Sequence, residues 1–416
     1  MAESTESIVP GTLPSESASP LKPKGYWHLV GQQFRKNKVA LFSLYLIGLL
    51  FLVAAFAPII ANGKPLIWTR DGVTTYPLIA SFVAPEYNID LVFNFLCLAT
   101  LFVPLVFVAK LILERGFQRH LPNWVFWTAG ALLALLPFLD VHTGFRRQFD
   151  TRTPYVALAE TLDASKGERA VFTLVGQDPI TPTADLLKAP DRKSWLGTDS
   201  QGRDVLARML HGARISLSVG FVAEGIAVFL GILFGALAGF YRGWVDIAIS
   251  RFIEVIICFP TLFLILIIIA YSEKRSIFFI MVVIGLTGWT GIARLVRGEF
   301  LKLSELEYVQ SARALGASSL RLMFRHMLPN AMGPVLVAGA FGVAGAILIE
   351  SALSYLGFGA PPPTPSWGEM ISQGNANLEA AWWLIVFPGL SIFLTVTSYN
   401  LAGDGLRDAM DPKMRH

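Results

Sequence analysis

The feature of this 416-residue sequence that most limits its fold is a series of eight long apolar stretches. A helix needs about 20 mostly apolar residues to cross a bilayer. The series predicts an all-α polytopic membrane protein with eight transmembrane helices, and the fifth helix is expected to begin early, near Ile247. The stretches are 39–61, 91–109, 121–139, 215–240, 255–271, 276–293, 327–349 and 380–403.

The composition agrees with a membrane protein and excludes several classes of function. Charged residues make up 15% of the chain, whereas a typical soluble domain has about 25%. The net charge of +4 is too small to indicate a nucleic-acid partner. Cys97 and Cys258 both lie within apolar stretches, and the six histidines form no HExxH-type cluster. Neither a disulfide framework nor a metal site is therefore expected.

Lysine and arginine in the connections predict how the chain crosses the membrane, because cytoplasmic loops carry an excess of them. Arg35, Lys36 and Lys38 precede or begin the first apolar stretch. Six basic residues fall in 294–325 and none falls in 350–379. Both termini and 294–325 are therefore expected on the cytoplasmic side, with 350–379 outside.

A polar, basic segment with helical spacing, 305–330, separates the sixth and seventh apolar stretches. Val309, Ala312 and Leu315 fall on one stripe at helical spacing. Gly316 permits a turn after that stripe. The pattern predicts two short helices that are joined at Gly316.

The second of these helices, 320–327, is expected to end before Pro329. The residue before a proline, here Leu328, is biased toward an extended conformation. Periodicity alone leaves two interpretations of the whole segment open. It is either an interfacial helix that merely joins two spans, or a docking element that a soluble partner grips.

The letters QSARALG at 310–316, followed after nine residues by HMLP at 326–329, resemble the EAA loop of prokaryotic ABC-importer permeases. In that family the loop forms a coupling helix that fits a cleft on the ATP-hydrolysing subunit. Gln310 and Ser311 stand where the commonest pattern has Glu and Ala, which removes one charge. The resemblance implies that an ATPase-coupling loop is formed by Glu307, Gln310, Ser311, Ala312, Gly316, Leu328 and Pro329.

Four more stretches resemble the same family, specifically its C-type dipeptide and oligopeptide permease subunit. They are QQFRKNKVALFSLYLIGL at 32–49, WLGTDSQGRDVLARMLHGARISLSVG at 195–220, RGWVDIAISRFIEVIICFPTLFL at 242–264 and ESALSYLGFGAPPPTPSWGEMI at 350–371. The resemblance implies the type I permease fold of ABC importers, with six core transmembrane helices plus two inserted ones.

The same resemblance implies the partners and the location of the chain. It would form half of a translocation path for peptides or peptide-like solutes by alternating access, as a heterodimer with a second homologous permease subunit. Two ABC ATPase subunits would use ATP and Mg, and an extracytoplasmic substrate-binding protein would deliver the solute. This chain would bind no cofactor and catalyse no reaction, and its place would be the prokaryotic cytoplasmic (inner) membrane.

Four regions are expected along the chain. Residues 1–24 form a disordered tail, rich in Ser, Glu and Pro, and 25–61 hold an N-terminal segment and the first span. Residues 62–194 form an insertion with two extra spans and an external loop. The permease domain is 195–416, with the coupling loop at 305–330. An even number of inserted spans preserves the topology that follows.

Charged residues near the apolar stretches are candidates for a translocation path. A charge at mid-bilayer costs roughly 2.5–3.5 kcal/mol on insertion scales, so Glu224 should face a cavity, the bundle interior or an interface, unless it reaches water at a helix end. Glu350 and Ser351 begin the outer-loop motif that the family places near the substrate path. Arg251 and Glu254 are three residues apart and are expected to pair on one helix face.

The motifs on the outer side also have structural interpretations. Gly197 and Gly202 permit tight turns, and Asp199, Ser200 and Asp204 are natural helix caps at a surface. Three tryptophans are expected to anchor the outer membrane boundary: Trp367, Trp382 and Trp383. Small residues in the span 327–349 are expected to pack helices closely: Gly333, Gly339, Gly342 and Gly345.

Two rival functions are an ion-coupled secondary transporter and a membrane scaffold that moves no solute. Secondary transporters show intramembrane ionisable groups and repeated halves, but Glu224 alone suggests the former and no internal repeat is evident. The sequence holds no GxxxxGK[ST] motif for nucleotide phosphates. It leaves the solute open among dipeptides, longer peptides, peptide antibiotics and nickel.

Overall fold

The computed structural model describes residues 26–78, 93–94, 155–159, 161–162, 167–272 and 276–411. The predicted tail 1–24 and nearly all of the predicted spans 91–109 and 121–139 lie outside these residues. The total of eight spans therefore stays a prediction.

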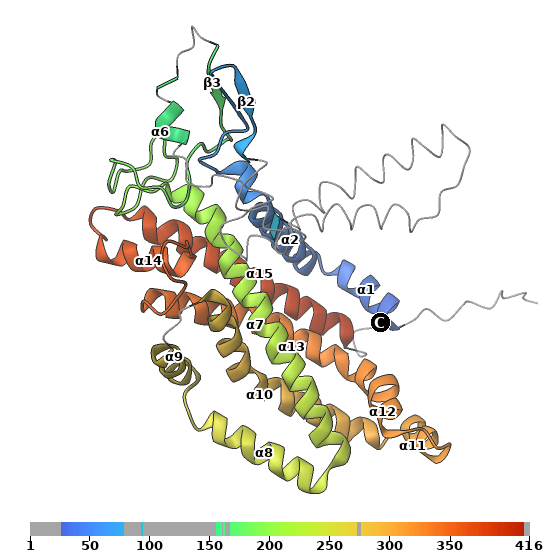
Figure 1. Ribbon diagram of the computed structural model, residues 1–416. Coiled ribbons are helices and arrows are strands. Elements are labelled where there is room, and N and C mark those ends of the chain that lie inside the picture. Colours follow the sequence, from blue (N-terminus) through green and yellow to red (C-terminus); the bar gives the residue numbers. More distant parts are fainter. Residues whose placement is uncertain are drawn as a thin grey trace, which may run out of the picture.

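Long helices dominate the described part of the chain (Figure 1). Five are long and apolar enough to cross a membrane: α2 (Lys38–Ile60), α7 (Val205–Tyr241), α10 (Ile277–Ser304), the continuous helix Ser319–Tyr355 that contains α13 (Leu328–Tyr355), and α15 (Trp383–Met410). A bent pair, α8 (Gly243–Ile257) and α9 (Thr261–Tyr271), makes up to six. The remaining helices are α1 (Tyr26–Lys36), α6 (Tyr155–Ala159), α11 (Glu307–Ala314), α12 (Ser319–Arg321) and α14 (Trp367–Ala376).

The prediction of one continuous fifth span is wrong, because α8 and α9 meet at 80°. Pro260 lies at the break and begins the second helix of the pair. A proline offers no N–H to the preceding turn and disfavours a helical conformation at the residue before it. The free thiol of Cys258 is exposed at this break.

Close packing of the bundle depends mainly on glycines of α7, and in the seventh span on Gly342, which packs against Glu224. A Cβ added at Gly235 would lie 2.5 Å from the Ala293 carbonyl oxygen of α10, and Gly231 is equally crowded by Ile292. In contrast, a Cβ at Gly345 of α13 would meet nothing within 4 Å. Small residues allow helix backbones to approach, and here that approach joins α7 to α10.

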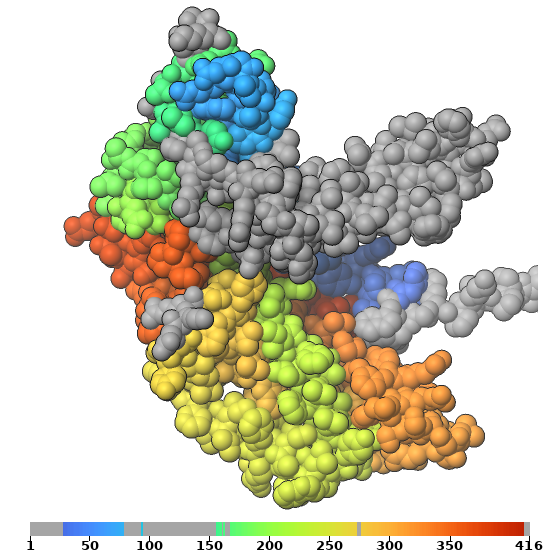
Figure 2. All heavy atoms as spheres, viewed as in Figure 1, coloured from blue at the N-terminus to red at the C-terminus, as the bar shows by residue number. Residues whose placement is uncertain are grey.

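A small antiparallel sheet lies at one end of the bundle (Figures 1 and 2). Its strands are β1 (Ile67–Arg70), β2 (Val73–Thr75) and β3 (Arg169–Val171), in the order β2-β1-β3. Residue Ile67 pairs with Val171. The sheet thus takes two strands from the start of the insertion and one from its later part. The coupling segment, orange in Figure 2, lies at the opposite end of the bundle.

The segment that leads into α7 forms two tight turns. Gly197 and Gly202 have φ angles of +81° and +76°, as their positions in the motif predict. Asp204 caps α7 by accepting a hydrogen bond from the Ala207 N–H at 2.8 Å. Asp199 and Asp204 are 0% and 1% exposed, so the expected surface position of these caps is wrong.

Two of the three tryptophans expected at the membrane boundary are buried instead. The indole N–H of Trp367 donates to the Met209 carbonyl and that of Trp383 donates to the Thr198 carbonyl, both at 3.1 Å. Only Trp382, which is 51% exposed, is free to act as an anchor. A buried indole needs a partner for its N–H, and the backbone supplies one from α7 itself and one from the segment before it.

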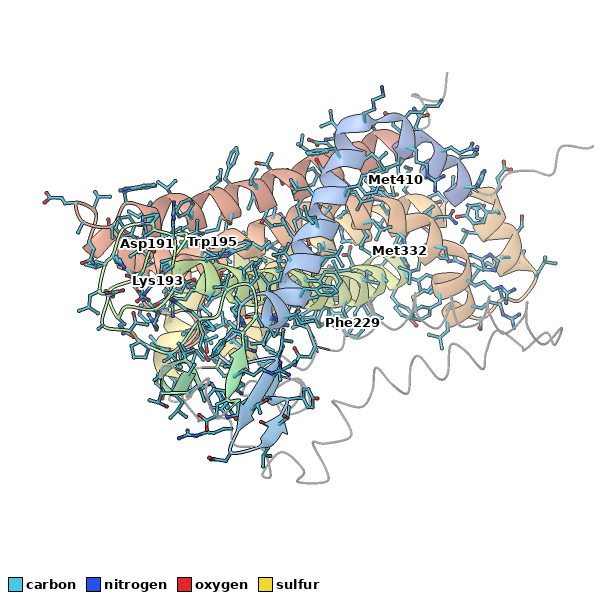
Figure 3. All side chains as sticks on the ribbon, turned by 90° about the horizontal axis from the view of Figure 1, so that it is seen from above. Asp191, Lys193, Trp195, Phe229, Met332 and Met410 are labelled. Carbon is cyan, nitrogen blue, oxygen red and sulfur yellow. The ribbon has the colours of Figure 1, made fainter. Side chains whose placement is uncertain are left out.

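A loop, 188–198, precedes α7. Figure 3 shows Asp191, Lys193 and Trp195 of this loop at one end of the molecule, with Met332 and Met410 toward the other. Asp191 accepts hydrogen bonds from two loop N–H groups and pairs with Lys188 at 2.8 Å. The hydrogen bond from Lys188 holds the pKa of Asp191 at about 2.

Candidate functional site

The predicted coupling segment folds as a helix, a glycine turn and a second helix. α11 (Glu307–Ala314) ends just before Gly316, whose φ is +83°. This left-handed conformation is unfavourable for residues that carry a Cβ. The Gly316 N–H donates to the Arg313 carbonyl and the Ala317 N–H donates to the Ala312 carbonyl, at 3.0 and 3.1 Å. The turn predicted at Gly316 is confirmed.

One apolar residue anchors α11 to the bundle. Val309 is fully buried, in a cluster that includes Phe300 and Leu303 of α10. Leu315, expected on the same stripe, is 88% exposed, because it follows the last turn of α11 and points away from the cluster. The exposed large apolar side chains of this region are Leu306, Tyr308, Leu315, Leu320 and Phe324.

The second helix does not stop before Pro329. Residues 322–327 form a π-helical turn, and Leu328 is helical, with φ −56° and ψ −45°. A wider π turn leaves room for a proline that offers no N–H and whose ring crowds the preceding turn. The predicted boundary at Leu328 is therefore wrong, and the segment from Ser319 runs directly into α13.

Hydrogen bonds tie α11 to the start of α13. The Asn330 amide donates to the His326 carbonyl at 2.7 Å and to the Tyr308 hydroxyl at 3.1 Å. The Tyr308 hydroxyl donates in turn to the His326 carbonyl at 3.4 Å. Partial burial raises the pKa of the Tyr308 phenol, so it stays a donor at neutral pH. The Gln310 side-chain amide donates to the Glu305 carbonyl.

The residues carried over from the EAA motif share this one region but differ in exposure. Glu307, Gln310 and Ser311 are exposed on α11, and Gly316 is exposed at the turn. Ala312 is half-buried against the α10 cluster. Leu328 is half-buried and Pro329 is exposed, both at the start of α13. The arrangement presents a small protruding surface that another protein can contact.

Glu224 lies at mid-length of α7, 19 residues after Val205 and 17 before Tyr241. Its carboxylate packs against Gly342 of α13, since a Cβ at that glycine would lie 2.1 Å from the carboxyl carbon. Within the described residues, no hydrogen bond or ion pair reaches this carboxylate. Glu224 therefore faces the seam between α7 and α13 and not a helix end.

Glu350 and Ser351 are enclosed rather than open. Glu350 is 0% exposed. It accepts hydrogen bonds from the hydroxyls of Ser354, at 2.7 Å, and Ser216 of α7, at 3.2 Å. The Ser351 hydroxyl donates to the Ile347 carbonyl of its own helix. In this conformation Glu350 joins α7 to α13, and both residues are buried.

A buried charged cluster near the turns at Gly197 and Gly202 was not expected from the sequence. Arg203 is paired with Asp199 at 2.7 Å, and Arg208 is paired with Glu369 of α14 at 2.5 Å. Both arginines are buried. A signal was present in the spacing of acids and bases in GTDSQGRDVLAR, but the partner on α14 lies 161 residues away. The exposed pair Arg251 and Glu254, at 2.6 Å, confirms its prediction.

Comparison with known proteins identifies two family models along the chain. The model of the binding-protein-dependent transport system inner membrane component matches 231–416. The model of the N-terminal TM domain of oligopeptide transport permease C matches 25–85. The first model includes the whole coupling segment.

Three relatives show how far the similarity extends. A dipeptide transport system permease of Alkalihalophilus pseudofirmus is 40% identical over 235 residues, which are 56% of this chain and 77% of the relative. An oligopeptide transport system permease of Bacillus subtilis is also 40% identical, with the same coverage of each chain. A peptidoglycan transport system permease of Agrobacterium fabrum is 32% identical over 96% of this chain and 98% of its own length.

A solved methionine ABC transporter in an inward-facing conformation covers 49% of this chain and 96% of its own, with 17% identity and a TM-score of 0.42. The Agrobacterium relative matches nearly the full length of this chain. It therefore also has a long region between its first span and the stretch that corresponds to GTDSQGRD at 197–204. The motifs, the helical bundle and the relatives lead to one assignment. This chain belongs to the binding-protein-dependent permeases of ABC importers, the family that includes the dipeptide and oligopeptide permeases.

Proposed function

We propose that this permease carries peptides or peptide-like solutes across the prokaryotic inner membrane as half of a heterodimer with a second permease subunit. Its relatives are named for dipeptide, oligopeptide and peptidoglycan transport. The family implies separate ATPase and solute-binding partners. In this proposal two ATPase subunits use ATP and Mg, and this chain binds no cofactor and catalyses no reaction. Family membership does not favour the ion-coupled transporter or the scaffold.

The observation that carries the mechanism is the geometry of α11. It is fixed to α10 through one buried valine and to α13 through Asn330, and its remaining surface is exposed. In the proposed cycle an ATPase subunit binds α11 and the turn at Gly316. Closure of the ATPase dimer then displaces α10 and α13 together, and the path opens to the outside. The termini and α11 face the cytoplasm in this proposal.

Glu224 is the residue of this chain best placed to contribute to the path. Its carboxylate is unpaired among the described side chains and lies at mid-length of α7. A charge at that depth is costly without water or a partner. Glu350 and Ser351 stay predictions as path residues, and their enclosure supports a structural role instead. Replacing Glu224 with Gln tests the proposal through uptake kinetics, since a path residue should change the KM for the solute while ATPase assembly is unaffected.

A substitution at Gly316 tests the coupling site. In Gly316→Leu the left-handed backbone becomes unfavourable by roughly 1–2 kcal/mol, so the turn is expected to rearrange and ATP-dependent uptake to be lost while membrane insertion stays normal. The matched control is Gly298→Leu in α10, where a Cβ would meet nothing within 4 Å. Unchanged uptake in Gly316→Leu would remove the docking proposal. Isolation of the assembled complex with its binding protein, followed by identification of the bound small molecule, tests the solute.

A further inference from the structure

The elbow between α7 and α8 is held in a strained conformation. Arg242, the single residue between the two helices, has φ +56° and ψ −163°, and the next residue, Gly243, has φ +53°. A non-glycine residue in such a region costs about 1–3 kcal/mol and persists only where its surroundings hold it. The contacts that hold Arg242 therefore indicate what the elbow is fixed to.

Those contacts lie at the end of α10, just before the coupling helix. The Arg242 guanidinium donates to the Ser304 hydroxyl and to the Glu305 carboxylate through Nη2, both at 2.5 Å. Ser304 is the last residue of α10, and Glu305 lies two residues before α11. The elbow is thus bonded to the short connection between α10 and α11. Any displacement of α11 would move this connection first.

Two further contacts run between the same elements. Arg297 of α10 forms a two-pronged ion pair with Asp246 in the first turn of α8, with Nη2 to Oδ2 at 2.7 Å. The guanidinium of Arg313, on α11, lies over the ring of Phe240, 5.8 Å from its centroid. Three basic side chains therefore connect the elbow with α10 and α11.

α8 packs against the bundle through one face only, where Ile249 and Ile256 lie beside Ile253 and the Phe252 ring is 6.0 Å from the Trp289 ring of α10. Of its 15 residues only Ile253 is buried, and Figure 1 shows the helix leading away from the elbow at one edge of the bundle. The link from α11 into α13, in contrast, passes through the π-helical turn 322–327. A π turn is a local irregularity of the helix and is frequent at functional sites. The coupling helix is thus joined to α7 by a side-chain contact and to α13 through a segment that includes a π-helical turn.

We propose that Arg242 is a positioning residue that transmits displacement of α11 to α8 through its bond to Glu305. This proposal rests on the coupling function proposed for α11 and adds the route by which the motion leaves it. When α11 moves with its ATPase partner, the end of α10 moves as well. The bonds from Arg242 to Ser304 and Glu305 then displace the elbow between α7 and α8. α8 then changes its angle to α7 as a rigid helix, because only one of its faces packs against the bundle.

A charge-exchange experiment tests this route in the complete reconstituted importer. Arg242→Glu and Glu305→Arg each place like charges together, whereas the double variant restores an opposite pair. The readout is the number of ATP molecules hydrolysed per solute imported, which a purely structural defect would not change in the surviving transporters. Since allosteric couplings are typically 1–3 kcal/mol, each single variant is expected to raise this ratio about fivefold or more. The double variant is expected to return it to within about twofold of the wild type.

The controls separate this proposal from the coupling function itself. Arg251 and Glu254 form an exposed ion pair of similar length within α8, so their single and exchanged variants should leave the ratio unchanged. If Arg242→Glu fails to assemble, Glu305→Ala removes the acceptor of this bond at an exposed site and should raise the ratio by itself. A wild-type complex that couples ATP to uptake, together with an unchanged ratio in both variants, would overturn the proposal alone. A wild-type complex in which ATP hydrolysis and uptake are unrelated would overturn the coupling function as well.

Discussion

Two glycine-to-alanine substitutions in α7 offer a direct test of how the bundle is packed. Gly235 lies against α10, where a Cβ would be 2.5 Å from the Ala293 carbonyl oxygen and 2.7 Å from the Val296 Cβ. Gly225, ten residues earlier on the same helix, would place its Cβ in open space. Two of the crowding atoms at Gly235 belong to the α10 backbone, so the two helices must separate to admit a methyl group.

The magnitude follows from comparing the two variants. Replacing a helical glycine with alanine gains up to about 1 kcal/mol of helix propensity, and this gain is common to both. Overpacking of a well-packed site costs about 1–3 kcal/mol and applies to Gly235→Ala only. The difference in unfolding free energy between the variants is therefore expected to be about 1–3 kcal/mol, with Gly225→Ala at or above the wild type.

Thermal unfolding of the purified protein in detergent measures this difference. Gly235→Ala is expected to unfold at a lower temperature than the wild type, and Gly225→Ala at an equal or higher one. Both variants should be compared in the same detergent and lipid, because membrane proteins respond strongly to either. Equal shifts in the two variants would show that α7 and α10 do not approach as closely as described.

Three further predictions concern the outer side and the topology. Reporters fused after Arg119 and after Lys166 are expected to report opposite sides of the membrane; same-side results would contradict the pair of inserted spans. Trp383→Phe, which removes a buried indole hydrogen bond, is expected to lower the unfolding free energy by about 1 kcal/mol, whereas Trp382→Phe, at an exposed site, should leave thermal unfolding unchanged. The pKa of Asp191 is lowered to about 2. The ionised carboxylate therefore stabilises the folded loop fully above the ordinary carboxyl pKa, and this stabilisation is lost as the pH falls through about 2. Protease resistance of the loop 188–198 should therefore stay constant from about pH 8 to about pH 5, and Asp191→Asn should reduce it across that range.

Local sequence patterns predicted the elements that depend on local chemistry. The turn at Gly316, the cap at Asp204 and the pairing of Arg251 with Glu254 each involve residues within a few positions of one another, and all three are confirmed. The apolar stretches likewise located the described long helices, because a span needs only length and composition. The family motifs then identified the coupling segment.

The predictions that were wrong depend on partners far away in the sequence. Trp367 and Trp383 are apolar residues at helix starts, which is typical of a membrane boundary, yet their indoles bond to carbonyls more than 150 residues away. Leu328 is helical because the preceding turn is a wider π-helical turn. The rule for the residue before a proline takes no account of the width of that turn. The contact of Arg242 with Glu305 spans 63 residues, and no local pattern marks it.

The pairing of β1 with β3 has a consequence for the region that distinguishes this chain from shorter relatives. Ile67 and Val171 are separated by about a hundred positions, yet their strands are neighbours, and neighbouring strands lie about 4.8 Å apart. Between these strands, however, the described residues also contact the bundle: Leu78 and Phe93 are buried in its core, and the Arg214 guanidinium of α7 donates to the Asn94 side chain at 3.2 Å. Removal of everything between β1 and β3 would therefore also take away side chains that pack against α2 and α7, so a shortened variant has to keep these contacts if the helices are to hold their positions.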